Sequence, residues 1–284
     1  MENSIKRNFV IGDQWMYYKL YCGVNVADDI LIDAIVPFTK KQLDNNIISS
    51  WFFIRYNDPD FHLRIRFKLI CETHTGIIIS ELKKLLIPHL NSGFIWDVQL
   101  HQYKREIERY GSSTITYIEN LFFWDSETIL KAKEKQLTEE ESIIFIVKLI
   151  SIILSQFKFS KESKFKFAEK GRNAFKSEFN ANKITMKDLS ERSRKILSQK
   201  ESFRKTNLLQ LLKTYSENTN QTFTKINELY NSGNVEVSLN NLTSSIIHMT
   251  INRYFNSNQR LYEFLIYDVL YKEYKTDLFK PSLK

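Results

Sequence analysis

Nine consecutive residues in the first quarter of the chain alternate strictly between apolar and polar side chains. The segment is FHLRIRFKL, from Phe61 to Leu69. Successive side chains of a β-strand point to opposite faces, so this period of two predicts a strand with one apolar and one polar face. A turn signal, NDPD at 57–60, and the apolar run from Trp51 to Tyr56 precede it. We therefore expect two adjacent antiparallel strands here.

The polar face of this strand carries His62, Arg64, Arg66 and Lys68. An antiparallel sheet with one wet face accounts for such a pattern, and from the residues alone it is the stronger interpretation. Two arginines on one face nevertheless indicate an anion site, because guanidinium groups bind carboxylates through paired hydrogen bonds and stay charged at cellular pH. A dicarboxylate or an enolate suits such a pair.

The rest of the first half predicts further strands and helices of a mixed sheet layer. Residues 15–22 are aromatic and strand-like, and 28–41 show helical spacing, with Pro37 expected to bend or end that helix early. A helix at 76–90 and a strand at 95–103 follow. We expect an α+β fold with an antiparallel sheet in this N-terminal half.

From Thr114 onward the apolar periodicity is almost wholly helical. The helices that this periodicity predicts are 113–131, 139–157, 163–179, 186–200, 207–217, 239–254 and 259–274. The chain has only seven glycines and four prolines, and it shows neither an internal repeat nor a flexible linker. We therefore expect one domain, residues 1–284, in which the helical half packs against the sheet.

Charge and cysteine content narrow the kinds of protein this can be. The net charge of +8 is concentrated in 158–205, a basic helical segment with 15 Lys or Arg and 6 Asp or Glu. That segment could contact a peptide, an acidic partner or RNA. Two cysteines make no disulfide framework or metal cluster. With no signal sequence and no apolar run of membrane-spanning length, we expect a cytoplasmic protein without metal or cofactor.

A second polar group follows the last predicted strand, in YKREIERYG from Tyr103 to Gly111. Glu106 and Arg109 are three residues apart, which makes them neighbours on a helical turn. A simple ion pair worth about 0.2–0.5 kcal/mol explains this spacing. The functional alternative is that Glu106 orients an arginine toward a cleft.

A third group lies in the predicted helix 239–254. Helical spacing sets His248 on one stripe with Asn252, which is expected to hold one ring nitrogen. The stripe predicted to be buried consists of Leu242, Ile246 and Met249. A lone histidine is usually a surface or satisfied core residue, but an ordinary pKa near about 6.5 suits it to acid or base catalysis. No glycine-rich phosphate loop, histidine-rich metal motif or nucleophile elbow is present.

Together these segments resemble the C-terminal elimination domain of class I lantibiotic dehydratases and related stand-alone thiopeptide-type bacteriocin biosynthesis proteins. The motifs that carry the resemblance are WFFIRYNDPDFHLRIRF at 51–67, YKREIERYG at 103–111, LFFWDS at 121–126 and HMTINR at 248–253. The basic segment 158–205 and the extreme termini lie outside it. One departure is Ser112, where the family often has a second glycine after the Arg-Tyr pair.

In that family a larger domain uses glutamyl-tRNA to esterify serine and threonine side chains of a precursor peptide, and the small domain then eliminates glutamate. The resemblance thus implies a glutamylated precursor peptide as substrate, a separate glutamylation subunit as partner and dehydroalanine or dehydrobutyrine as product. The catalytic residues it implies are Arg64, Arg66, Arg109 and His248. The supporting candidates are Glu106, His62, Asn252 and Arg253, and His62 is also a second candidate for proton transfer.

These residue types also suit the chemistry itself. Glutamate bound through an ester leaves as a carboxylate, so the difficult step is removal of a weakly acidic α-proton. Arginines stabilise the developing enolate, and a preorganised donor of this kind contributes roughly 2.7–4 kcal/mol. His248 is the natural acid or base.

Two alternatives remain open beside elimination. A thiopeptide-type enzyme of similar architecture joins two dehydroalanines into a pyridine ring. A non-catalytic module would dock a leader peptide or an acidic partner through the basic segment, and would tolerate loss of His248 but not charge reversal near Arg192 and Lys195. RNA binding is not favoured, because no stacking motif accompanies the basic segment.

Overall fold

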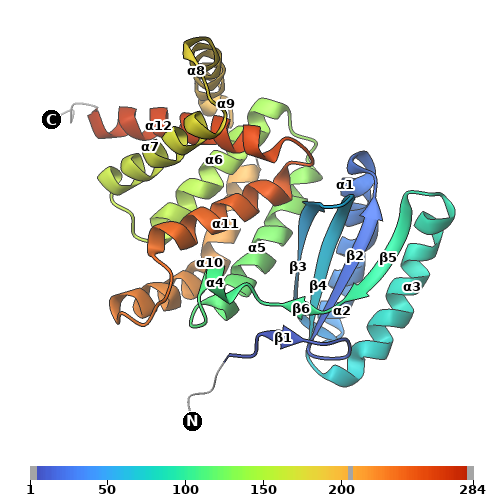
Figure 1. Cartoon of the computed structure of the whole chain (residues 1–284). Helices are drawn as coiled ribbons and strands as arrows, with labels where there is room; N and C mark the ends of the chain where they lie inside the picture. The colour runs from blue at the N-terminus through green and yellow to red at the C-terminus, as the bar shows by residue number, and fades with distance from the viewer. Residues whose placement is uncertain (1–4, 204–206, 280–284) are drawn as a thin grey trace.

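A four-stranded antiparallel sheet lies beside a helical half in the computed structural model, which describes residues 5–203 and 207–279 (Figure 1). The strand order is β3-β4-β2-β5. The strands are β2 (Trp15–Cys22), β3 (Ile48–Asn57), β4 (Phe61–Leu69) and β5 (Ile95–His101). A second, two-stranded sheet joins β1 (Asn8–Phe9) to β6 (Tyr103–Lys104). The expected α+β fold and the antiparallel pairing of β3 with β4 are confirmed.

Helices cover the apolar face of the sheet. A continuous helical segment comprises α1 (Ala27–Asp29), the π-helix η2 (Ile30–Ile35) and α2 (Val36–Asp44). The ring of Phe38 on α2 lies 5.5 Å from that of Phe67 on β4. The prediction that Pro37 ends the helix early is wrong: the helical segment continues to Asp44, and the π-helix η2 ends two residues before Pro37. Helix α3 (Thr75–Asn91) packs beside β5.

The second half is helical throughout, as predicted. Its helices are α4 (Ile107–Tyr110), α5 (Ile115–Lys133), α6 (Glu139–Gln156), α7 (Lys161–Glu178), α8 (Lys183–Ser198), α9 (Lys200–Phe203), α10 (Leu208–Asn231), α11 (Leu239–Tyr254) and α12 (Gln259–Phe279); the short 3-10 turns η1 (Val24–Val26) and η3 (Glu72–His74) lie in the first half. The prediction for α10 ended fourteen residues too early. The buried stripe of α10 continues through Thr219, a polar residue that interrupts the apolar periodicity of the sequence. Its hydroxyl donates to the Tyr215 carbonyl, which allows the side chain to be buried.

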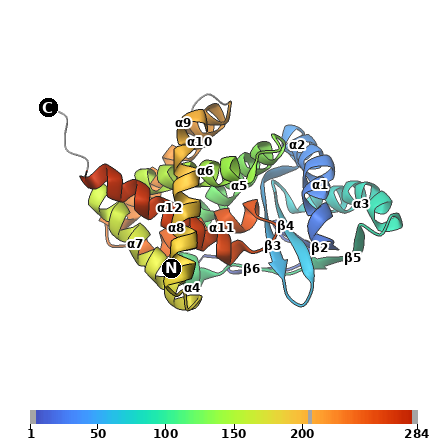
Figure 2. The same cartoon turned by 90° about the horizontal axis from the view of Figure 1, so that it is seen from above.

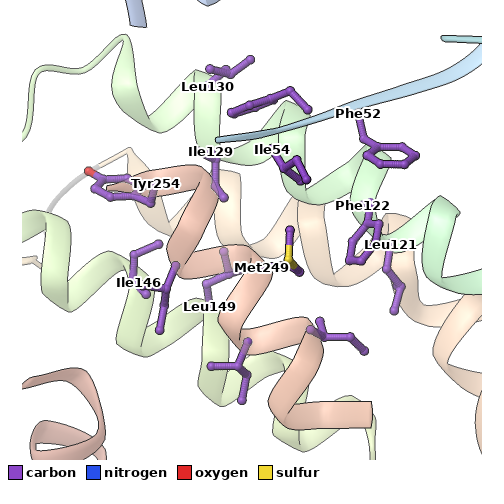
Figure 3. Close-up of a cluster of buried hydrophobic side chains, with 14 of the residues drawn as sticks. Phe52, Ile54, Leu121, Phe122, Ile129, Leu130, Ile146, Leu149, Met249 and Tyr254 are labelled. Carbon is purple, nitrogen blue, oxygen red and sulfur yellow. The ribbon is translucent and has the colours of Figure 1, made fainter. Parts of the chain in front are cut away.

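The two halves share one hydrophobic core. Figure 2 shows the sheet beside the helices of the second half from above. Helices α5 and α11 pack on β3, the edge strand nearest the helical half. Figure 3 shows this junction, where Phe52 and Ile54 of β3 meet Phe122 of α5 and Met249 of α11. The core therefore continues from the sheet into the helical half.

Helix α7 approaches α12 closely because its Gly171 has no side chain. A Cβ added at Gly171 would lie 2.3 Å from the Tyr267 ring. Beside this contact the fully buried Asp268 accepts hydrogen bonds from Arg172, Ser193 and Lys272. Burial alone would raise the pKa of Asp268, but these hydrogen bonds outweigh it and hold the pKa below its ordinary value.

Some of the positive charge of the basic segment is paired with carboxylates of another helix. Arg192 and Lys195 of α8 pair with Glu139 and Glu140 at the start of α6, at 2.6 and 2.7 Å. Residues 204 and 205 of the segment lie outside the described residues. Fewer basic side chains of the described part of this segment are therefore free to bind a partner than its net charge suggests.

Candidate functional site

The polar face of β4 is only partly wet: His62 and Arg66 are buried, whereas Arg64 and Lys68 are partly exposed. His62 is fully buried and only 6% of Arg66 is exposed. The strand register explains this, because Tyr17 of β2 and Phe52 of β3 flank Arg66 on the same face. Aromatic side chains of neighbouring strands thus replace solvent over Arg66.

Arg66 is held by aromatic rings and has no acidic partner. Its guanidinium carbon lies 4.4 Å from the ring centre of Tyr17, 4.9 Å from that of Tyr103 and 5.2 Å from that of Phe52. Its buried Nε has no hydrogen-bond partner, and among the described residues no carboxylate pairs with it. Cation–π contacts keep a desolvated guanidinium in place without cancelling its charge. An anion that enters this site would therefore meet an uncompensated positive group.

Arg64 lies two residues along the same strand and contacts a different ring. Its guanidinium carbon is 3.3 Å from the ring centre of Tyr56, and its Nε donates to Nε2 of His62 at 3.0 Å. Nδ1 of His62 lies 2.8 Å from the Asp60 carbonyl, so Nδ1 carries the ring proton and both nitrogens are occupied. Burial lowers the pKa of His62, which favours this neutral form. His62 thus orients Arg64, and its ring offers no free nitrogen for proton transfer.

A narrow crevice connects Arg66 to the helical half. It has a volume of about 20 Å³, room for about one water molecule, so a larger anion reaches Arg66 here only if lining side chains move. Glu106, Tyr110 and Met249 line it together with Arg66. Burial raises the pKa of Tyr110 to about 12, and its hydroxyl interacts electrostatically with Arg66, Glu106 and Arg109.

Glu106 and Arg109 form the expected neighbouring pair. Arg109 Nη1 lies 3.6 Å from Glu106 Oε2 across the start of α4, and the Arg109 side chain is 35% exposed. The guanidinium also lies 5.3 Å from the Tyr110 ring centre. Arg109 therefore stands beside the crevice, while Glu106 and Tyr110 line it.

His248 on α11 is held by a carboxylate and not by Asn252. Its Nδ1 lies 3.1 Å from Oε2 of Glu263 on α12, and the same oxygen accepts from Arg260. The prediction that Asn252 holds the ring is wrong, because its amide instead pairs with both the N–H and the carbonyl of Arg55 on β3. Asn252 thus satisfies the free edge of the sheet, where the main chain needs partners.

Arg253 ties the sheet to two helices. It is fully buried, its Nη1 lies 2.8 Å from Asp125 of α5, and its Nε donates to the Phe53 carbonyl at 2.8 Å. These contacts give Arg253 a structural role, because they join β3, α5 and α11.

The structure brings some of the predicted residues together and separates others. Arg66 and Glu106 line one crevice, and Arg109 adjoins it. His248 does not line this crevice, although its sequence neighbour Met249 does. The His248 ring instead contacts Glu263 on α12. The residues missed at the sequence level are Tyr17, Tyr56, Tyr103, Tyr110 and Glu263. No local pattern identifies them, since each acts through a contact between elements.

Residues 5–203 and 207–279 contain neither a membrane-spanning helix nor a candidate metal site. Within these ranges no helix is long and apolar enough to cross a membrane. The same residues contain no group of three or more His, Cys, Asp or Glu side chains placed to hold a metal ion.

Comparison with known proteins places these features in a family. The model for the lantibiotic biosynthesis dehydratase C-terminal region matches residues 15–274. The subtilin biosynthesis protein SpaB of Bacillus subtilis is 27% identical over 266 residues, which are 88% of this chain and 24% of SpaB. The chain thus spans about a quarter of the length of this relative.

Solved structures share the fold. The tRNA dependent lantibiotic dehydratase MibB from Microbispora sp. 107891 superposes with a TM-score of 0.72 at 19% identity, over 95% of this chain and 29% of MibB. The pyridine synthase TbtD from thiomuracin biosynthesis reaches 0.60 at 10% identity, over 94% of this chain and 99% of TbtD. Since the family model matches nearly the whole chain, the protein belongs to the lantibiotic biosynthesis dehydratase C-terminal family.

Proposed function

We propose that this protein eliminates glutamate from glutamylated serine and threonine residues of a ribosomally made precursor peptide. The observation that carries the proposal is Arg66, a buried guanidinium held by three aromatic rings with no carboxylate partner among the described residues. Burying an uncompensated charge is costly. Such an arrangement is retained where an anionic substrate or transition state supplies the missing charge.

The elimination breaks the Cα–H and Cβ–O bonds, and it forms a bond between the proton and the base and a second bond between Cα and Cβ. A base removes the α-proton, and the C–H electron pair becomes the second bond between Cα and Cβ. The Cβ–O pair leaves with the glutamate carboxylate. Negative charge develops on the carbonyl oxygen of the reacting residue, and Arg66 and Arg64 stabilise that charge while Arg109 holds the glutamyl carboxylate.

His248 is the proposed proton acceptor. Glu263 also accepts from Arg260, so it acts as a carboxylate acceptor toward His248 and places the ring proton on Nδ1. The neutral ring then has its free electron pair on Nε2, where it can accept the α-proton. Glu263 serves as the positioning residue in this arrangement.

The test is a single-turnover assay without tRNA or ATP. Purified protein is incubated with a glutamylated precursor peptide, and mass spectrometry follows loss of one glutamic acid per modified residue. Wild type should give the alkene, whereas His248→Ala and Arg66→Lys should leave the ester intact. His89→Ala, on α3, is the matched control and should behave as wild type.

An unchanged ester with wild type would count against elimination by this chain alone. The assay is then repeated with a glutamylation subunit, because we propose that the partner of this protein is a cytoplasmic glutamylation subunit. Failure in that mixture as well would refute the proposal.

A pyridine-forming cycloaddition is the second candidate. The observation that favours it is a fold shared with a pyridine synthase over nearly the whole of both chains. A mixture of glutamylated and fully dehydrated peptides separates the two reactions, because elimination consumes the first and cycloaddition only the second. The third possibility, docking of a leader peptide through the basic segment, is less well supported because Arg192 and Lys195 already pair with Glu139 and Glu140.

A further inference from the structure

A larger crevice lies where the end of β3 meets the turn between α11 and α12. Its volume is about 370 Å³, within the range of sites that hold small ligands. Tyr56 and Asn57 contribute one wall, and Ser257, Asn258 and Gln259 contribute the other. This crevice is separate from the narrow one beside Arg66, whose lining shares none of these residues.

Amides and a hydroxyl dominate the polar lining of this crevice. Asn57, Ser257 and Asn258 are exposed, and among the described residues their side chains have no hydrogen-bond partner. Neither a lysine nor a carboxylate lines it. Asparagine side chains present one donor group and one acceptor, the same pair that a peptide unit presents. The lining thus matches an uncharged peptide main chain better than it matches an anion.

The buried side chain of Arg55 forms part of the crevice lining. Arg55 is 2% exposed, lines the crevice and pairs through Nη2 with Asp28 Oδ1 at 2.5 Å. Its Nη1 is buried and has no hydrogen-bond partner. A buried donor without an acceptor is costly, so the wall beside Arg55 retains an unmet hydrogen-bonding capacity.

Tyr56 connects this crevice to the arginines of β4. It lines the crevice, while its ring is the one that Arg64 contacts and lies 5.5 Å from the His62 ring. Tyr56 therefore belongs both to the lining of this crevice and to the surroundings of Arg64. A peptide that passes the end of β3 would reach both the crevice and the surroundings of Arg64, because Tyr56 is common to the two.

We propose that this crevice binds the main chain of the peptide substrate beside the residue that undergoes elimination, with Asn57 and Asn258 as the principal hydrogen-bonding side chains. The inference rests on the proposed function. It adds a subsite that recognises peptide groups, independent of the side chains of the precursor. Short substrates that lack the neighbouring residues would not use it.

The test compares a long and a minimal substrate. The long one is a synthetic peptide of about a dozen alanine and glycine residues around one O-glutamyl serine, and the minimal one is N-acetyl-O-glutamylserine N-methylamide. Asn57→Ala and Asn258→Ala should each raise KM for the long substrate roughly 2- to 12-fold, the effect of one hydrogen bond. The minimal substrate should be processed at the wild-type rate.

Asn231→Ala, an exposed residue at the end of α10, is the matched control and should change neither substrate. Circular dichroism verifies the fold of each variant. Equal losses on both substrates, or no loss on the long one, would overturn the subsite.

Failure of the proposed function is distinguishable from failure of the subsite. If wild type processes neither substrate, fluorescence anisotropy measures binding of the labelled long peptide without its glutamyl group. Weaker binding by both crevice variants than by wild type would support the subsite without elimination. Equal affinity, or absence of binding by wild type, would refute it.

Discussion

Removing the charge of Arg253 should destabilise the fold severely, whatever its effect on activity. Arg253→Met keeps a long side chain but leaves the buried carboxylate of Asp125 with only the hydroxyl of Thr250. Breaking one partner out of a buried ion pair costs about 3–5 kcal/mol. The carbonyl of Phe53 also loses its donor. Against a typical unfolding free energy of about 5–15 kcal/mol, this is a large fraction.

Urea unfolding followed by tryptophan fluorescence and circular dichroism measures the effect. With a slope of about 3 kcal/mol per molar, the midpoint should fall by about 1–2 M. The double variant Arg253→Met with Asp125→Asn strands no charge, so it should be more stable than the single variant. The double-mutant comparison thus separates the ion pair from simple loss of packing.

The opposite pattern would refute this reasoning. If Arg253→Met unfolds at the wild-type urea concentration and yet eliminates no glutamate, Arg253 acts in the reaction. Its inclusion among the supporting site residues would then be correct for a reason that the buried contacts do not provide.

Three further predictions concern packing and pH. Gly171→Ala should lower the melting temperature by calorimetry, because its Cβ would collide with Tyr267, whereas Gly76→Ala meets nothing within 4 Å and should not. Asp268→Asn should destabilise the protein at neutral pH; because the pKa of Asp268 is depressed, the urea-midpoint difference from wild type should shrink as pH falls below about 4. The His62 ring, whose pKa is lowered by burial, should protonate in an NMR titration only below the ordinary histidine range.

Sequence periodicity predicted the secondary structure near the site closely. Strand β4 begins and ends where the alternation of Phe61–Leu69 begins and ends, and helix α11 has the predicted bounds. The buried stripe of Met249 and the spacing of Glu106 and Arg109 also followed from helical geometry. Each of these depends only on residues close together in the chain.

One of the predictions that failed at the site depended on a distant partner. Asn252 is four residues from His248 and so can face the same way, yet its amide meets Arg55 on β3. Glu263, which does hold the ring, lies on another helix. Helical spacing says which side chains share a stripe, but it does not say what the stripe packs against.

The sequence by itself determined that Arg64 and Arg66 share a strand face, because side-chain alternation is a property of the extended backbone. Only the tertiary structure decided what covers that face. Strand register set Tyr17 and Phe52 beside Arg66, and β6 brought Tyr103 over it, so that the guanidinium is desolvated without being neutralised. Whether a charge is hydrated, paired or left for a ligand depends on neighbours from other elements, and the packing of those elements determines it.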